Sequence, residues 1–597
     1  MLREDLKMIL GELSPEAASG HTKIIGETWP NRLSGTKSLE GSVRYIVDEL
    51  RSYGLENATL HEFDGLISLP TRSELHIVSP ETKPIDSRAF AQIGSTPDGG
   101  IEAELVFVGP GGFPDYEGRE VKGKIVLAEL SYAPPRPEKV RIATLKGAAA
   151  VILCNWGPSD SEIIPLGTVK SVWGNPTPDN IDRMNVVPAL GISRKDGEYL
   201  MRLCKRGTAK MRLVAQATRE WKKLYQPWAR LEGTTDPEKF VILGGHTDSW
   251  AQGITDNASG DAVRLEIARV LAKHRDLLRR SVEFAFWVGH ENGIMEGSTW
   301  YVDNAWDRLN ANGLVYINVD SPGMKGTSRY VAWSSPEAIR WHSEIDREIV
   351  EKVKIDRVPL TKVGDQSFFG VGIPSVFGLT MHTPEEVKNW RGAILGTWYH
   401  SEQDTWDIFD VELLMEALRP MAAYILDICT RLVLPFEYVT VAEEFIAQLQ
   451  EYQVAGGGHL DLKELIGLAQ RLRIKAQGLD YYGRSLETRY EVADEAEKRD
   501  LEVRAESVNQ CQMRLARVLT RVRAQVADRY DQDTYGLSAL HKSVPVLYEI
   551  DQFPKLNREE QTYKLLMTKM VRERNRVADA LSEAICSIDH TMALLGV

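Results

Sequence analysis

The pattern of hydrophobic and polar positions divides the chain into parts with different periods. Near the N-terminus, apolar residues recur at the helical spacing i, i+3, i+4 and i+7, at Val43, Ile46, Val47 and Leu50. This stripe predicts an amphipathic helix that ends near Gly54. A strand-like run, ATLHEF, follows it.

The pattern changes between about residues 68 and 217. Short apolar runs rich in strand-forming residues are separated by Gly and Pro, as in AELVFVGPGG, GKIVLAEL and GAAAVILCNW. Such short runs, each bounded by turn residues, favour β-strands over long helices. We therefore predict a separate, β-rich domain inserted into the surrounding fold.

Long apolar strands begin again at Lys239. The runs FVILGG, VEFAFWVG and GLVYINVD are separated by helical patterns such as DAVRLEIARVLAKH. Continuous apolar strands that alternate with helices predict a mostly parallel sheet with helices on both faces. In such open α/β sheets, ligands bind beyond the carboxyl ends of the strands.

Strand patterns disappear after about residue 431. A helical period is formed by Leu462, Leu465, Ile466, Ala469 and Leu472, and the stretch 487–528 is rich in Arg and Glu. We therefore predict an α/β fold with an inserted β-rich domain and a C-terminal helical domain. The expected limits are 1–67 and 218–430 for the α/β domain, 68–217 for the insert and 431–597 for the helices.

The charge balance narrows the possible partners. Acidic side chains outnumber basic ones by 85 to 72, for a net charge of −13, which repels phosphate backbones and anionic lipid. We expect neither a nucleic-acid partner nor a membrane partner. The five scattered cysteines form no CxxC pair, and no apolar run reaches the length of a signal core or a membrane span. These features predict a cytoplasmic protein.

Side chains that bind metal ions follow the predicted strands. Two imidazoles and three carboxylates stand just beyond strand ends or in adjoining loops, at His246, Asp256, Glu291, Asp320 and His400. Because parallel strands bring their carboxyl ends to one edge of a sheet, we expect these groups to converge. Nitrogen and oxygen donors of this kind suit one or two divalent metal ions, with zinc the first expectation.

Two further features support a two-metal interpretation. Two dications close together need a bridging anion, and Asp256 is the candidate bridge. The three carboxylates carry a charge of −3 against +4 for two dications. One hydroxide would balance this charge and act as the nucleophile. Asp248 stands two residues after His246, where its carboxylate is expected to accept the second N–H of the imidazole.

The segments GGHTDSW, TDNASG, HENG, YINVD and YHSEQDT resemble the co-catalytic zinc aminopeptidase family, which includes glutamate carboxypeptidase and the non-enzymatic transferrin receptor. The resemblance extends over nearly the whole chain: the insert is similar to that family's protease-associated domain, and the helical part to its dimerisation domain. It implies that Asp256 bridges two metals, that Tyr399 polarises the scissile carbonyl, and that the chain forms a homodimer. It also assigns the metal ligands to His246, Asp256, Glu291, Asp320 and His400.

The chain departs from the family pattern at the catalytic position, because His290 stands where the family has a glutamate before Glu291. We expect hydrolysis of a peptide or amide bond of a small substrate, with His290 as the base. Two alternatives stay open. His290 binds metal or substrate in an altered reaction, such as that of a lyase or a non-peptide amidohydrolase, or the site binds ligands without turnover, as a receptor does.

Two further acidic residues each admit two roles. Asp365, in the segment VGDQSFF, either lies near the substrate or belongs to an ordinary turn, since GDQS is a turn-favouring cluster. Asp404, in HSEQDTWD, is expected to order the His400 loop or cap a helix.

Overall fold

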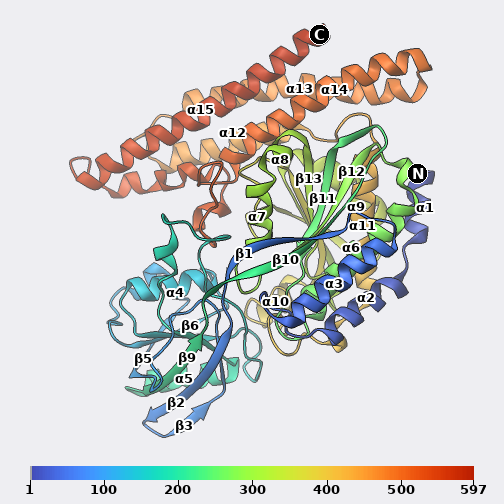
Figure 1. Ribbon diagram of the computed structural model, residues 1–597. Helices are drawn as coiled ribbons and strands as arrows, with labels where there is room; N and C mark the ends of the chain where they lie inside the picture. Colours follow the sequence, from blue (N-terminus) through green and yellow to red (C-terminus); the bar gives the residue numbers. More distant parts are fainter. Residues whose placement is uncertain (1–2) are drawn as a thin grey trace.

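The computed structural model describes residues 3–597 and contains two eight-stranded sheets (Figure 1). The first sheet has the order β1-β10-β12-β11-β13-β16-β14-β15. Its strands are, in that order, Thr59–Ile67, Glu220–Leu231, Arg280–Trp287, Asp236–His246, Gly313–Asn318, Ser375–Met381, Arg329–Ser334 and Lys354–Pro359.

The four central strands of this sheet, β12, β11, β13 and β16, are parallel to one another. Antiparallel pairings occur toward both sides, where β10 pairs with β12 and β1, and β14 pairs with β16. The sheet is therefore mixed, and the predicted parallel arrangement holds at its centre. As a result, the carboxyl ends of β12, β11 and β13 meet at one edge.

Helices cover both faces of the first sheet (Figure 1). One face carries α7 and α8, which span Glu296–Asn304 and Trp306–Asn312. The other side is built from α1 (Glu4–Glu12), α2 (Pro15–Thr28), α3 (Lys37–Ser52), α6 (Ser259–Lys273), α9 (Ile339–Ile349) and α11 (Val411–Thr430). The short α10 spans Pro384–Asn389.

The apolar strands divide their side chains between these two faces. In β11, Phe240 and Ile242 pack on the side of α7 and α8, whereas Val241 and Leu243 pack on the side of α6 and α11. Successive side chains of a strand point to opposite faces of the sheet. A strand that is buried on both faces therefore has an unbroken run of apolar residues in the sequence. The helix predicted around Val43 is confirmed as α3, and its apolar stripe is buried.

The second sheet has the order β3-β2-β9-β5-β6-β7-β8-β4 and its own apolar core. In that order its strands span Lys83–Ile85, Pro70–Ser79, Lys210–Ala217, Ile101–Gly109, Ile125–Glu129, Ala150–Cys154, Ala189–Ile192 and Ser87–Ala89. Helices α4 (Arg136–Leu145) and α5 (Arg194–Arg206) pack against it. The chain leaves the first sheet at the end of β1 and returns to it with β10.

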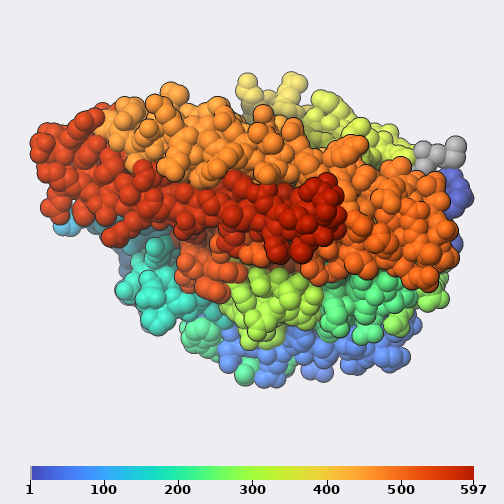
Figure 2. Space-filling view, turned by 90° about the horizontal axis from the view of Figure 1, so that it is seen from above, coloured from blue at the N-terminus to red at the C-terminus, as the bar shows by residue number. Residues whose placement is uncertain are grey.

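Four long helices follow α11: α12 (Tyr438–Ala455), α13 (Lys463–Val492), α14 (Glu495–Arg523) and α15 (Gln561–Leu595). Within residues 3–597 no strand follows β16, as the loss of strand patterns predicts. Figure 2 shows these helices, in orange and red, lying across one end of the molecule. They share a continuous apolar core with α11. No helix in the described part of the chain is long and apolar enough to cross a membrane.

Candidate metal centre

His246 is the last residue of β11, and its side chain is buried. Its Nδ1 lies 2.9 Å from the main-chain oxygen of Asp248. Because a carbonyl oxygen only accepts, Nδ1 carries the hydrogen in the neutral imidazole, and Nε2 then presents a lone pair. That Nε2 atom is buried and has no hydrogen-bond partner.

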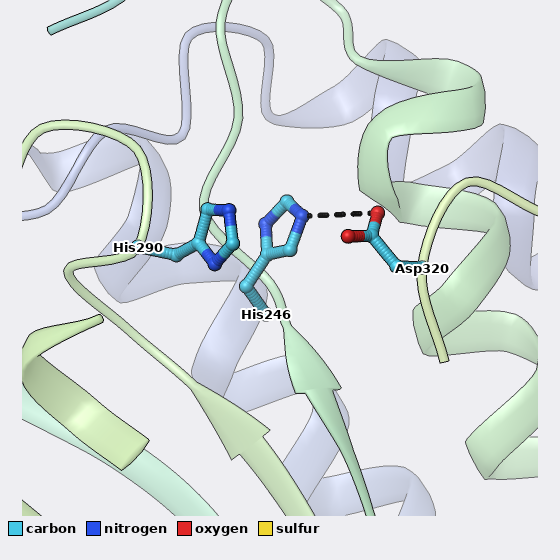
Figure 3. Close-up of side chains that lie close together, drawn as sticks. All are labelled: His246, His290 and Asp320. Atoms are coloured by element: carbon cyan, nitrogen blue, oxygen red, sulfur yellow. Dashed lines mark ion pairs between the residues drawn. The ribbon is translucent and has the colours of Figure 1, made fainter. Parts of the chain in front are cut away.

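Two carboxylates approach His246 Nε2 from different elements. Asp256, in the irregular segment Ile254–Ala258 before α6, places Oδ1 at 3.0 Å from it. Asp320, two residues beyond β13, places Oδ1 at 3.4 Å (Figure 3). The structure thus brings together three of the residues that the sequence predicted as metal ligands.

The remaining two predicted ligands, Glu291 and His400, lie on the other side of Asp256. Oδ2 of Asp256 and Oε2 of Glu291 each lie 3.2 Å from His400 Nε2. The two oxygens of Asp256 therefore face two different imidazoles. His400 Nε2 and Glu291 Oε1 are also buried without a hydrogen-bond partner.

These distances fit atoms that share a metal ion. Ligand atoms about 2.0–2.1 Å from a tetrahedral zinc ion lie about 3.3 Å apart. The four nitrogen-to-oxygen distances are 3.0, 3.4, 3.2 and 3.2 Å, yet neither imidazole Nε2 makes a hydrogen bond. Buried polar atoms rarely stay unpaired in this way. The donor set therefore fits divalent cations at this site.

The electrostatics of the cluster favour a cation. Burial lowers the pKa of His400, but the carboxylates of Glu291 and Asp256 outweigh it and raise this pKa to about 9. Burial raises the pKa of Asp256, but His246 and His400 outweigh it and lower this pKa. The buried carboxylates thus attract positive charge, which protons supply in the absence of metal.

His290 follows β12 and stacks on His246, with ring centroids 3.9 Å apart (Figure 3). Its Nδ1 lies 3.1 Å from Asp365 Oδ2, while Asp365 Oδ1 accepts a hydrogen bond of 2.9 Å from Ser298. The carboxylate makes Nδ1 the donor and leaves Nε2 of His290 free. His290 also lies close enough to His246 and Asp320 to share a metal ion with them.

Asp248 contacts the site in a different way from the predicted one. Its carboxylate accepts the main-chain N–H of Glu291 at 2.9 Å and that of His290 at 3.2 Å. Its Oδ1 lies 3.8 Å from His246 Nδ1, and the main-chain oxygen of Asp248 accepts that N–H instead. The carboxylate of Asp248 therefore positions the segment that follows β12, and its main-chain oxygen positions the imidazole of His246.

Two other side chains hold the ligands in place. Trp250 donates its indole N–H to Glu291 Oε2 at 2.9 Å. Asp404 accepts the main-chain N–H groups of Thr255 and Asp256, each at 3.0 Å. Asp404 thereby fastens the loop that carries His400 to the segment that carries Asp256, in keeping with its predicted ordering role.

Tyr399 lies beside the cluster, with its ring 4.0 Å from that of His400. Burial and then the carboxylates of Asp256 and Glu291 raise its pKa well above the ordinary value. The phenol therefore keeps its proton and is able to donate a hydrogen bond.

No sequence pattern indicated a role for Arg136, which lies in α4 of the second sheet's domain. Its Nη2 lies 3.5 Å from His400 Nδ1, and its Nε and Nη1 donate to the main-chain oxygens of Thr168 and Leu166. The guanidinium pairs with no carboxylate within residues 3–597. Its neighbour Pro135 and the run around it carry no recognisable motif, so only the tertiary structure identifies this residue.

The C-terminal region also approaches the site: burial raises the pKa of Tyr535, Arg136 lowers it, and the carboxylates of Glu291 and Asp320 raise it. Tyr535, in the loop between α14 and α15, donates its main-chain N–H to Ser171 at 2.8 Å. Its ring packs on Trp173, with centroids 5.8 Å apart. Residues from the first sheet, the second sheet's domain and the C-terminal region therefore gather around one site, and no local sequence pattern predicts the last two contributions.

Comparisons with known proteins agree with this arrangement. Residues 228–425 match the model of Peptidase family M28, and residues 101–200 match that of the PA domain. A probable glutamate carboxypeptidase of Zea mays is 25% identical over 500 residues, which are 70% of this chain and 67% of that protein. A probable leucine aminopeptidase 2 of Aspergillus oryzae is 28% identical over 302 residues, 49% of this chain and 54% of that protein.

Among solved structures, a zinc aminopeptidase from Bacillus subtilis is similar, with a TM-score of 0.53 and 22% identity. The match covers 70% of this chain and 95% of that one, and it shows a common fold. The matches to the two curated proteins span only about half to two thirds of their lengths.

Proposed function

We propose that this chain, which carries a domain of Peptidase family M28 and a PA domain, is a metal-dependent hydrolase of small peptides or amides. One observation carries the proposal: the two oxygens of Asp256 each face the unpartnered Nε2 of a different imidazole, His246 on one side and His400 on the other. This geometry supports two metal positions joined by one carboxylate.

The residues that would hold the metals fall into two groups around Asp256. His246 and Asp320 complete one group, and Glu291 and His400 complete the other. We propose zinc, because the donors are nitrogen and oxygen and the similar Bacillus protein is a zinc enzyme. When bound, divalent ions in such a site polarise a carbonyl group and lower the pKa of water.

His290 is the proposed base. With Nδ1 held by Asp365, its Nε2 accepts a proton from the attacking water and returns it to the leaving nitrogen. Positioned acid–base groups contribute about 10²- to 10⁴-fold to a rate. The second candidate role, that of a metal ligand, is supported by the closeness of His290 to His246 and Asp320.

Two further side chains would act on the substrate. Tyr399 keeps its proton, so its O–H donates a hydrogen bond to the substrate carbonyl oxygen as negative charge develops there. Arg136 brings a positive charge without a carboxylate partner to within 3.5 Å of His400. This favours substrates that carry a carboxylate near the scissile bond, as in carboxypeptidase-type cleavage.

The proposal is tested with zinc-loaded protein and three matched substrates: an N-acyl dipeptide with a free carboxylate, its C-terminal amide, and an aminoacyl anilide. We expect cleavage of the first and at least tenfold lower kcat/KM for the amide. Preference for the anilide would assign aminopeptidase activity instead. Full metal content without turnover of any of the three would favour altered chemistry, and failure to bind metal would favour a receptor-like protein.

A His290→Glu variant sharpens the assignment of the reaction. Gain of peptidase activity on these substrates would mean that histidine redirects the site to another reaction. Loss of all activity would support His290 as the working base of a hydrolase.

We also propose a homodimer formed through the C-terminal helices. Ile474 and Tyr481 project one above the other from α13 and are 62% and 70% exposed, and Val503 on α14 is 69% exposed. Exposed apolar side chains of this kind favour a protein interface. Light scattering should give twice the chain mass, and Tyr481→Glu should reduce it to one chain mass.

The predicted domain limits and the cytoplasmic location are proposed on separate grounds. The passages between the two sheets, at residues 67–70 and 217–220, support the limits 1–67, 68–217 and 218–430. The five unpaired cysteines support a reducing compartment.

A further inference from the structure

A cavity of about 360 Å³ lies where the ends of β14 and β15 meet the C-terminal helices. Its volume is within the range of small-molecule sites. Much of its wall is apolar and is formed by Pro336, Ile339, Val358, Pro359, Leu360 and Leu540. The cavity therefore offers an apolar surface between two parts of the chain that is open to solvent at Ile339 and Val358.

One charged residue in the cavity wall stands out. Arg523, the last residue of α14, is only 4% exposed. Its Nε and Nη2 atoms are buried without a hydrogen-bond partner. Its Nη1 lies 3.6 Å from Glu444 Oε1, the one carboxylate oxygen within 4 Å among residues 3–597. Ser543 also donates to this oxygen.

A second buried arginine of the same helix differs, because each of its guanidinium nitrogens donates a hydrogen bond within the chain. Arg517 is also buried, but its nitrogens donate to the main-chain oxygens of Asn310, Gly372, Leu309 and Gly313. A buried polar group without hydrogen bonds costs free energy, and a charged group costs more. With Nε and Nη2 unpartnered, Arg523 is therefore less well satisfied than Arg517, and an anion in addition to Glu444 would stabilise it.

Among residues 3–597, Glu444 is the one carboxylate within ion-pair distance of Arg523, and it faces Nη1, so Nε and Nη2 stay without a partner. Burial raises the pKa of the Glu337 carboxyl, and this side chain does not come within ion-pair distance of Arg523. The other arginine and the lysines of the cavity wall already have partners: Arg357 pairs with Asp346, Lys362 with Asp533 and Lys542 with Glu451. Among the arginines and lysines of the wall, the spare hydrogen-bonding capacity therefore resides in Arg523.

We propose that this cavity binds a small aliphatic carboxylate. Its carboxylate pairs with the guanidinium of Arg523, and its hydrocarbon body lies against Ile339, Val358 and Leu540. The charge selects an anion, and the apolar wall selects a ligand with a hydrocarbon body over a small inorganic ion. This inference does not depend on the function proposed for the metal centre.

The test uses the full chain and isothermal titration calorimetry, with hexanoate as the probe and 1-hexanol as the uncharged match. We expect hexanoate to bind at least tenfold more tightly than hexanol. Arg523→Met should remove this preference and weaken hexanoate binding at least tenfold, because it removes a charge-assisted hydrogen bond. Arg514→Met, an exposed position on the same helix, should leave binding unchanged.

Equal hexanoate affinity for the wild type and Arg523→Met, or no saturable binding to the wild type, would overturn the proposal. Hexanoate held instead at the metal centre would be lost in Asp256→Asn but kept in Arg523→Met, which would also overturn it. The midpoint of thermal unfolding checks that Arg523→Met folds, and we expect it to be equal or higher, since a buried unpartnered charge is removed. A marked fall would instead show that Arg523 has a purely structural role.

A second variant leaves the arginine in place. Ala524→Leu adds volume to the cavity wall next to Arg523 and should weaken hexanoate binding at least tenfold. Unchanged affinity in this variant would place the bound hexanoate outside the cavity and contradict the proposal.

Discussion

The cluster of proposed metal ligands around Asp256 and the cavity beside Arg523 are two buried polar sites whose unbalanced charges have opposite signs. In the cluster, carboxylates surround imidazole nitrogens such as His246 Nε2 that have no hydrogen-bond partner. In the cavity, a guanidinium has unpartnered nitrogens and a single distant carboxylate. The sign of the unbalanced charge indicates the class of ligand that each site would take: a cation in the first case and an anion in the second.

A third buried site shows that burial of charge alone does not imply a ligand. Lys170 and Glu296 form an ion pair of 3.0 Å in which both side chains are 0% exposed. The ammonium also donates to the main-chain oxygen of Gly293. Because the chain supplies both the cation and the anion, the charges of this pair are balanced, although Glu296 Oε2 has no hydrogen-bond partner within residues 3–597.

The largest expected effect is the loss of the shared carboxylate in the metal cluster. Asp256→Asn should reduce metal content and lower kcat/KM on the order of 10³-fold or more, since metal ions supply several kcal/mol of transition-state stabilisation. Metal content by mass spectrometry and substrate turnover check this. Asp303→Asn, at an exposed position, serves as the control and should change neither quantity.

Treatment of the wild type with a chelator should reproduce the effect of Asp256→Asn, and added zinc should restore activity in the wild type alone. Full metal content with normal turnover in Asp256→Asn would mean that this residue does not join two metal positions.

The next effect separates the two roles of His290. If it is the base, His290→Ala should lower kcat by about 10²- to 10⁴-fold and leave metal content unchanged. If it is a ligand, metal content should fall together with activity. Asp365→Asn, which keeps the shape of the partner but removes its charge, should cause a smaller loss of kcat. Unaltered kcat in His290→Ala would exclude both roles.

The buried ion pair of Lys170 and Glu296 provides a stability test. Lys170→Met should destabilise the protein by about 3–5 kcal/mol, because it leaves Glu296 buried without its counter-ion. Lys195→Met removes an exposed pair with Glu162 and should cost far less stability, because solvent screens the two charges. Denaturant unfolding measures both.

Adding Glu296→Gln to Lys170→Met should restore most of the lost stability. A double variant as unstable as the single one would indicate that packing, not unbalanced charge, causes the loss.

The smallest effect concerns a buried carboxyl that is neutralised by a proton. Asp480 accepts the main-chain N–H groups of Tyr438 and Val439, while burial raises its pKa to about 7. Because this folded-state pKa lies above the ordinary 3.8, its stabilisation is complete below pH 3.8 and is lost as the pH rises through 7.

Asp480→Asn stays neutral at every pH and should remove this dependence. The midpoint of thermal unfolding of the wild type, relative to that of the variant, should fall by a few degrees at most between pH 5 and pH 8. A difference that stays constant over this range would mean that Asp480 does not titrate there.

The sequence predicted the parts of the site that the strands themselves carry. Apolar runs end at His246, shortly before Glu291 and just before Asp320, and parallel strands bring their ends to one edge. The order of alternating strands and helices therefore also indicated where the edge would lie. For these residues, the local strand pattern alone predicts their place at one edge of the sheet.

Other features of the site depend on contacts that no local pattern encodes. Arg136 and His400 are far apart in the sequence, and their approach depends on how the two sheets pack. The same is true of the contact between Asp365 and His290. For Asp248, the residue was predicted but not the atom, because the main-chain path decides whether its carboxylate or its carbonyl oxygen meets the imidazole.

We propose above that Asp256 joins two metal positions, and anomalous scattering at the zinc edge, from crystals grown with zinc, would locate both. We expect anomalous density among His246, Asp256 and Asp320, and among Asp256, Glu291 and His400. Density elsewhere in the molecule, or none at either position, would contradict this proposal.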